Sequence, residues 1–140
     1  MSDFAQWNKW KKKFKGFIAF DFDGVLAKYN GWRGFNKLGK PIKQIIKLVQ
    51  RLYKENYYII IWTGRQDTPT LRQWLKTNEV PYHTLNNPKH NPPVASAMKP
   101  YFQCVVDDRA INPVDLCTGE IKSVNKLYKQ IKKTIERAQK

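Results

Sequence analysis

The stretch from Phe17 to Leu26 constrains the fold more than any other part of the chain. It reads Phe-Ile-Ala-Phe-Asp-Phe-Asp-Gly-Val-Leu, so an apolar run typical of a buried central strand ends at Asp21 and Asp23, just before Gly24. Two carboxylates at the end of a core strand repel each other and lose hydration, which costs stability unless a cation or a positive side chain compensates. A hard ion such as Mg²⁺ prefers oxygen ligands and leaves positions to water and phosphate. The stretch therefore predicts a site for phosphate chemistry.

Polar residues also follow two later strand-like runs. Residues 57–62 form a β-rich apolar run that ends at Thr63-Gly64-Arg65, and residues 101–106 form another that ends at Asp107-Asp108-Arg109. The alternative for the first stretch is a simple turn, since Asp and Gly commonly open one. Three polar strand ends in one chain favour a common site over three separate turns.

The order of the expected elements indicates an α/β fold. Strands are predicted at 17–20, 57–62, 80–85 and 101–106, and amphipathic helices at 41–56, 68–78 and 121–140. This alternation is typical of a three-layer, Rossmann-like open parallel sheet with helices on both faces. Because ligands bind beyond the carboxyl ends of such strands, we expect the three polar strand ends to meet.

The length of 140 residues indicates a single main domain. We expect residues 1–16 to form a basic, aromatic N-terminal arm and residues 17–140 to form the domain. In the arm, Trp7, Trp10 and Phe14 fall at helical spacing among lysines. This spacing fits a short helix packed on the domain, and it also fits an arm that follows a phosphate backbone and stacks on bases. A turn-rich flap at 27–40 is too short to be a second domain.

The charge of the chain is strongly positive. Its 26 Lys and Arg against 11 Asp and Glu give a net charge of +15, which attracts polyanions such as DNA or RNA. A basic proteome, or packing inside a larger particle, would produce the same composition.

The two cysteines, Cys104 and Cys117, lack metal-ligand spacing and are expected to be reduced. Since no apolar run approaches transmembrane length, we expect a soluble cytoplasmic protein without a membrane partner.

Four motifs occur in the order that they have in the haloacid dehalogenase (HAD) superfamily of phosphotransferases, which the chain resembles over residues 17–112. They are Asp21-Phe22-Asp23-Gly24-Val25, Thr63 in Trp-Thr-Gly-Arg, Lys99 in Met-Lys-Pro, and Asp107-Asp108. More narrowly, the chain looks like the small members without a cap domain and is similar to the 3′-phosphatase domains of bacteriophage polynucleotide kinases. Val25 departs from the family's usual Thr, at a position that is neither an acid nor a metal ligand.

The resemblance implies a phosphomonoester hydrolase that works through an aspartyl-phosphate. Asp21 would be the nucleophile, and Asp23 would protonate the leaving alkoxide and then deprotonate water. Thr63 would hydrogen-bond a phosphoryl oxygen, and Lys99 would neutralise developing charge, with Lys89 as a less favoured substitute. An acid at position 23 favours phosphoryl transfer over dehalogenation, because a halide needs no proton.

The resemblance also implies Mg²⁺ as the cofactor. Its ligands would be the Asp21 carboxylate, the Asp23 backbone carbonyl and Asp107, with Asp108 nearby or acting through water. The residues that could help to grip the phosphate are Gly64, Arg65, Arg33 and Arg109. For each of these arginines an exposed structural role is the favoured interpretation.

The absence of a cap bears on the substrate. An uncapped site stays open to solvent and suits a bulky phosphorylated substrate, and the net charge of +15 favours a nucleic-acid terminal phosphate. Two alternatives stay open. One is a capless phosphatase of a nucleotide or sugar phosphate, and the other is a non-catalytic basic component that binds nucleic acid or serves structure on the same fold.

Overall fold

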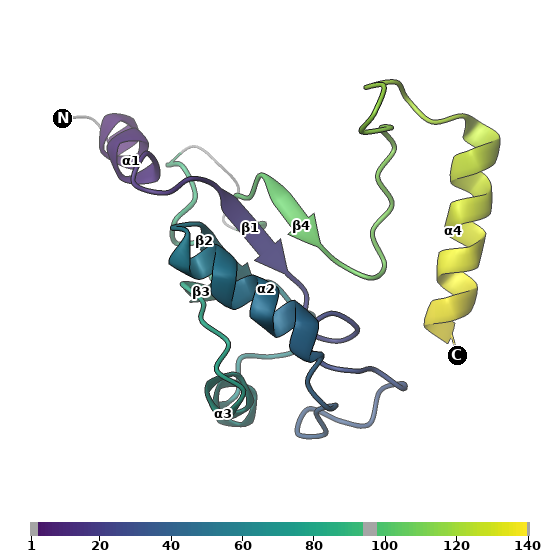
Figure 1. Cartoon of the computed structure of the whole chain (residues 1–140), viewed down its shortest axis with the longest axis horizontal. Coiled ribbons are helices and arrows are strands. Elements are labelled where there is room, and N and C mark those ends of the chain that lie inside the picture. Colours follow the sequence, from purple (N-terminus) through teal and green to yellow (C-terminus); the bar gives the residue numbers. More distant parts are fainter. Residues whose placement is uncertain (1–2, 94–97, 140) are drawn as a thin grey trace.

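Figure 1 shows a computed structural model of the chain that describes residues 3–93 and 98–139. Its elements, in chain order, are α1 (Asp3–Lys11), β1 (Phe17–Phe20), α2 (Lys43–Lys54), β2 (Tyr58–Ile61), α3 (Pro69–Thr77), β3 (Thr84–Leu85), β4 (Cys104–Val106) and α4 (Val124–Gln139). This order confirms the predicted alternation, although β3 and β4 are shorter than expected. Residues 1, 2 and 140, which the predicted arm and last helix include, lie outside the described residues.

The four strands form one parallel sheet in the order β3-β2-β1-β4, which confirms the predicted α/β class. Phe17 of β1 pairs with Tyr58 of β2, and Ile18 pairs with Cys104 of β4 on the other side. The chain places β2 and β3 on one side of β1 and then returns to place β4 on the opposite side. The strand order therefore reverses between β1 and β4, and such a reversal opens a crevice beyond the carboxyl ends of the strands.

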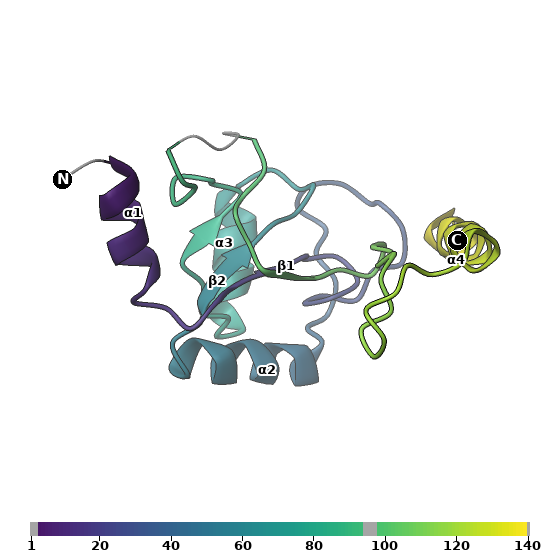
Figure 2. The same cartoon turned by 90° about the horizontal axis from the view of Figure 1, so that it is seen from above.

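The two central strands, β1 and β2, are buried because they are apolar on both faces. Successive side chains of a strand point to opposite faces, so each of these two strands contributes to two apolar clusters. Figure 2 shows α2 running along one face of the sheet. The larger cluster joins β1 and β2 to α2 and α3 and includes Phe20, Ile59, Ile61, Ile46, Val49, Leu71 and Leu75. The other face carries a cluster of Phe17, Ala19, Tyr58 and Ile60, against which Trp10, Phe14 and Tyr101 pack.

The helix predicted in the N-terminal arm is confirmed as α1. Trp7 Nε1 donates to the His90 carbonyl at 2.7 Å. The Trp10 ring lies 5.5 Å from the Phe17 ring and 5.3 Å from the Tyr58 ring, centroid to centroid. Aromatic pairs at such distances stabilise beyond their buried area. The arm's aromatic side chains thus pack on the domain.

The start of α3 follows its sequence signal closely. Thr68 caps the helix, because its Oγ1 accepts from the Leu71 N–H at 3.2 Å, and Pro69 occupies the first helical position. These features confirm the predicted helix start. Leu71 and Leu75 then point into the larger cluster, which fixes α3 against the sheet.

The last helix, α4, stands apart from the sheet in Figure 1. Its predicted apolar stripe is present, but none of its described residues is buried, and Val124, Tyr128, Ile131 and Ile135 are 46% to 81% exposed. At its far end, Arg137 Nη2 donates to the Asp108 carbonyl. Within the described residues, no helix combines the length and apolar character that crossing a membrane requires.

Candidate active site

Three carboxylates meet where the strand order reverses. Asp21 directly follows β1, and its N–H donates to the Val106 carbonyl at 3.0 Å, which ties the ends of β1 and β4 together. Asp107 and Asp108 directly follow β4. One carboxylate oxygen from each of Asp21, Asp107 and Asp108 lies within 4.8 Å of the other two. The structure thus brings together acids that are more than eighty residues apart in the sequence, while the Asp23 side chain lies outside this group.

The charge of these acids is poorly compensated. Burial raises the pKa of Asp21 to about 6, although its Oδ1 accepts a 2.7 Å bond from the Phe22 N–H. The negative charges of Asp107, Asp108 and Asp23 act in the same direction as burial. Burial, together with the charge of Asp107, also raises the pKa of Asp108. The charges of Arg109 and Arg137 act against the shift of Asp108. Partial burial and the proximity of the other acids thus both disfavour the charged forms of Asp21 and Asp108.

Asp108 has a carboxylate oxygen that suits a metal ligand. Its Oδ1 is buried and accepts no hydrogen bond from the part of the chain that the structure describes. Buried carboxylate oxygens normally have a partner, and leaving one without any is costly. Beside two further carboxylates, this oxygen belongs to a donor set that suits a hard divalent cation such as Mg²⁺.

Gly24 makes room for this arrangement. Its φ is +80°, a left-handed conformation that glycine adopts without strain. A Cβ at this position would also overlap the Asp108 carboxylate. The glycine of the first motif therefore both forms the turn after the strand and admits an acid from the neighbouring strand.

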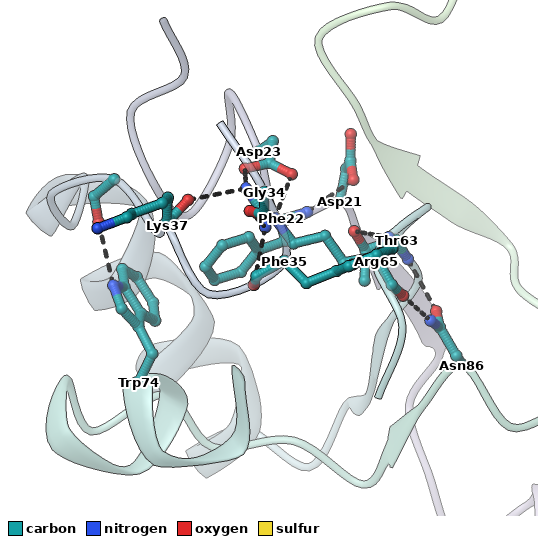
Figure 3. Close-up of polar contacts among 11 residues, drawn as sticks. Asp21, Phe22, Asp23, Gly34, Phe35, Lys37, Thr63, Arg65, Trp74 and Asn86 are labelled. Atoms are coloured by element: carbon teal, nitrogen blue, oxygen red, sulfur yellow. Dashed lines mark hydrogen bonds and ion pairs between the residues drawn. The ribbon is translucent and has the colours of Figure 1, made fainter. Parts of the chain in front are cut away.

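Asp23 is paired with Arg65 (Figure 3). Arg65 Nε donates to Asp23 Oδ2 at 2.7 Å and Nη2 donates to Oδ1 at 3.0 Å, which is a bidentate pair. The remaining donors bind the flap. Nη1 reaches the carbonyls of Gly34 and Phe35, and Nη2 also reaches that of Lys37, all at 3.2 Å. Every N–H of the guanidinium group is therefore engaged.

This arrangement corrects the prediction of an exposed role for Arg65. Its side chain is only 4% exposed, and its guanidinium group lies 4.8 Å from the centroid of the Trp32 ring. With all donors bound to Asp23 and to the flap, none remains for a phosphate. Arg65 instead holds the flap against the acid that follows β1.

The loop after β2 is held by Asn86, which the sequence analysis did not identify. Asn86 Oδ1 accepts from the Thr63 N–H at 2.9 Å, and its Nδ2 donates to the Arg65 carbonyl at 2.8 Å. Thr63 Oγ1 in turn accepts from the Arg65 N–H at 3.1 Å. The signal for Asn86 is its place directly after the predicted third strand, in a left-handed conformation (φ +52°) that Asn tolerates.

Most of the predicted site residues line one pocket of about 250 Å³ over the strand ends. Its lining consists of Asp21, Asp23, Tyr29, Trp32, Thr63, Gly64, Arg65 and Arg109. Arg109 is anchored there, since its N–H donates to Asp107 Oδ1 at 2.7 Å and its guanidinium group lies 5.5 Å from the centroid of the Tyr29 ring. Tyr29 is a further wall residue that the sequence analysis missed.

Five predicted residues do not line this pocket. Two of them are metal-site acids, since Asp107 is absent from the lining and Asp108 lines a neighbouring pocket with Arg109 and Arg137. The other three are basic. The Lys99 side chain is exposed, with its Nζ 5.4 Å from the centroid of the Phe102 ring. Lys89 lines a separate pocket with Asp67. Arg33 lines a second pocket beneath the flap. Neither Lys99 nor Lys89 therefore lines the pocket in which the resemblance implied a lysine beside the scissile phosphate.

Comparisons with known proteins bear on the fold alone. No family model and no curated protein matches the chain. The solved structure of a conserved protein from Bacteroides thetaiotaomicron aligns with 84% of this chain and 90% of its own, at 20% identity and a TM-score of 0.55. A protein from Vibrio cholerae of known crystal structure aligns with 84% of this chain and 98% of its own, at 18% identity and a TM-score of 0.46. The first of these likenesses supports the α/β fold.

Proposed function

We propose that the protein is a Mg²⁺-dependent phosphomonoester hydrolase of the HAD type, built on a three-layer Rossmann-like sheet without a cap domain. The observation that carries the proposal is the convergence of Asp21, Asp107 and Asp108 within 4.8 Å beside the Asp23–Arg65 pair. The side chains of these three acids and the Asp23 backbone carbonyl would hold Mg²⁺. When bound, the ion would shield the anionic nucleophile from the anionic phosphate.

Asp21 acts as the nucleophile. The bond that its Oδ1 accepts from the Phe22 N–H orients the carboxylate toward the pocket that it lines. One carboxylate oxygen attacks phosphorus and forms an aspartyl-phosphate while the bond from phosphorus to the leaving alcohol breaks. Water then attacks the same phosphorus, which releases inorganic phosphate and restores the Asp21 carboxylate.

Asp23 acts as the acid and the base. It gives a proton to the leaving alkoxide in the first step, and as a carboxylate it accepts a proton from the attacking water in the second. Arg65 donates to both carboxylate oxygens of Asp23, at 2.7 and 3.0 Å, and so holds the carboxylate in one orientation. Each oxygen keeps a further lone pair for the water. Arg65 is thus a positioning residue.

The pocket wall supplies the remaining groups. The Thr63 hydroxyl donates to a phosphoryl oxygen while its oxygen accepts from the Arg65 N–H, and Asn86 fixes this loop. We assign the positive charge beside the phosphoryl group to Arg109, because it lines the pocket and Lys99 and Lys89 do not. This assignment replaces the lysine expected from the resemblance.

The favoured substrate is a terminal phosphate of DNA or RNA. The net charge of +15 attracts such a polyanion, and an open site admits a chain end. A nucleotide or sugar phosphate remains the second candidate substrate, because the site pocket of about 250 Å³ is small.

The proposed compartment is the cytoplasm. Cys104 and Cys117 are both exposed and free, which fits a reducing compartment of this kind.

The test is a phosphate-release screen with purified protein. It compares 3′- and 5′-phosphorylated oligonucleotides with mononucleotides and sugar phosphates, with Mg²⁺ and with chelator. We expect Mg²⁺-dependent release that is fastest from an oligonucleotide end and that weakens as salt rises. Faster release from mononucleotides, with little salt dependence, would select the second candidate. No release from any substrate would contradict the proposal and favour a non-catalytic binding role.

A further inference from the structure

A second pocket lies beneath the flap, directly beside the site pocket. It has a volume of about 270 Å³, and the basic flap residues that line it are Lys28, Arg33 and Lys37. Asp23, Tyr29 and Arg65 line both pockets. The two pockets are therefore adjacent. We call the second one the flap pocket.

The flap pocket is rich in positive charge that no acid neutralises. Residues 28–40 contain no Asp or Glu. The acid in its wall, Asp23, is already paired with Arg65, and the ion pairs found among the described residues involve none of Lys28, Arg33 and Lys37. Three exposed basic residues that line one small pocket suit a compact anionic group such as a phosphate.

The flap pocket is held open by main-chain contacts. Arg65 binds three flap carbonyls, and the base of the flap is closed by the Lys28 N–H, which donates to the Lys40 carbonyl at 2.8 Å. Gly39 packs so closely on Lys28 that a Cβ there would overlap the Lys28 carbonyl. Trp74 Nε1 adds a bond to the Gly39 carbonyl at 3.0 Å. A preformed pocket costs less ordering entropy when a ligand binds.

We infer that the flap pocket binds a second phosphate of the substrate. The substrate class is then a phosphomonoester that carries another phosphate a few bonds from the scissile one. This inference rests on the proposed function, which seats the scissile phosphate in the pocket beside Asp21. Two sources share this chemistry, a small bisphosphate and a phosphorylated oligonucleotide end, whereas a simple sugar monophosphate lacks it.

The first test measures binding and needs no turnover. Titration calorimetry of the full chain at fixed ionic strength compares a nucleoside 3′-monophosphate with the matching 3′,5′-bisphosphate and with a 3′-phosphorylated dinucleotide. We expect at least one of the doubly phosphorylated ligands to bind roughly ten- to a hundredfold more tightly. Preference for the bisphosphate alone identifies a small-molecule source, and preference for the dinucleotide alone identifies a polynucleotide end. Equal affinity for all three ligands would overturn the inference.

A pair of matched variants separates the flap pocket from the general charge of the chain. Lys28→Ala/Lys37→Ala removes two flap side chains but keeps the Lys28 N–H that closes the base of the flap and the Lys37 carbonyl that Arg65 binds. Lys47→Ala/Lys54→Ala removes the same charge from exposed positions of α2. We expect the flap variant to lose the preference and the α2 variant to keep it, with both unfolding at the wild-type temperature. An equal loss in the two variants would show a long-range field and overturn the inference.

Turnover of p-nitrophenyl phosphate, which has a single phosphate, distinguishes this inference from the proposed function. The flap variant should hydrolyse it within about threefold of the wild-type rate, since only weak surface electrostatics change. Its kcat/KM for the preferred doubly phosphorylated substrate should fall by roughly ten- to a hundredfold. A parallel loss on both substrates would overturn the flap-pocket assignment while leaving the hydrolase intact. Wild-type protein that releases no phosphate from either would instead refute the proposed function.

Discussion

Asp21 and Asp23 are two residues apart, yet the structure gives them opposite surroundings. Both carboxylate oxygens of Asp23 accept hydrogen bonds from Arg65, whose other donors bind the flap. Asp21 has a backbone N–H and two more carboxylates within 4.8 Å. The protein therefore neutralises one acid with its own side chain and leaves the other in an uncompensated group. Under the proposed function, Asp23 is the acid oriented for proton transfer and Asp21 is the acid that binds the cation.

This contrast divides the site into two halves that can be perturbed separately. In the half around Arg65, loss of one partner would destabilise the fold, because it would leave Asp23 unpaired and free the flap carbonyls that the guanidinium group binds. The half around Asp21 opposes folding without a cation, since like charges and a buried unpaired oxygen cost free energy. Changes in the first half should mainly alter stability, and changes in the second half should mainly alter catalysis and metal binding.

The largest effect should come from Asp21→Asn. Removal of the nucleophile should lower kcat by roughly 10⁴-fold or more. The fold should persist and even gain stability without Mg²⁺, because a like charge disappears from the carboxylate group. Phosphate release and thermal unfolding measure the two effects. Asp67→Asn, at an exposed acid paired with Arg72, is the control and should keep full activity. Activity retained by the Asp21 variant would exclude the covalent mechanism.

Arg65→Ala should give the largest loss of stability. It leaves Asp23 without its buried partner and frees three flap carbonyls, so we expect the free energy of unfolding to fall by about 3–5 kcal/mol. Urea denaturation measures this loss, and hydrogen exchange should accelerate at the flap amides. Arg51→Ala, which breaks an exposed pair with Glu55, should cost less than about 1 kcal/mol. Similar costs for the two variants would show that the Arg65 pair does not hold the flap.

Mg²⁺ should stabilise the half that contains Asp21. At a concentration of about 100 times its Kd, a ligand that binds only the folded state adds about 2.7 kcal/mol. We therefore expect Mg²⁺ to raise the unfolding temperature and chelator to stop phosphate release. Asp107→Asn/Asp108→Asn should abolish the stabilisation, whereas NaCl at matched ionic strength should not reproduce it. Turnover that persists in chelator would remove the metal from the proposed chemistry.

Much of the fold was predictable because its signals are local. The continuous apolar runs of the buried strands, the Thr68 cap and the stripe of α2 each depend on neighbouring residues, and all are found in the structure. The meeting of Asp21 with Asp107 and Asp108 followed from topology, since the carboxyl ends of parallel strands lie on one edge. The strand order that places β4 beside β1 was then sufficient to gather these acids.

The remaining features depend on contacts between distant residues. The Arg65 side chain finds Asp23 and the flap across separations of 28 to 42 residues, and no local pattern distinguishes such an arginine from an exposed one. Asn86 is a similar case, because its role lies in bonds to a loop 21 and 23 residues away. The stripe of α4 predicted the helix but not its exposure, since a helical period identifies an apolar face without identifying what covers it.

The smallest of these effects should be the pH dependence of the uncompensated half. The pKa of Asp21 is raised from an ordinary value of 3.8 to about 6. The folded chain thus holds this proton more tightly than the unfolded chain, so without Mg²⁺ its stability should fall as pH rises from about 4 to about 6. Mg²⁺ must displace the same proton, so its stabilising effect should be weak near pH 5 and full near pH 8. Thermal unfolding at both pH values, with and without Mg²⁺, measures the difference, and Asp21→Asn should flatten it. A Mg²⁺ effect that is equal at both pH values would show that Asp21 is not a ligand, and would confine the metal to the acids that follow β4.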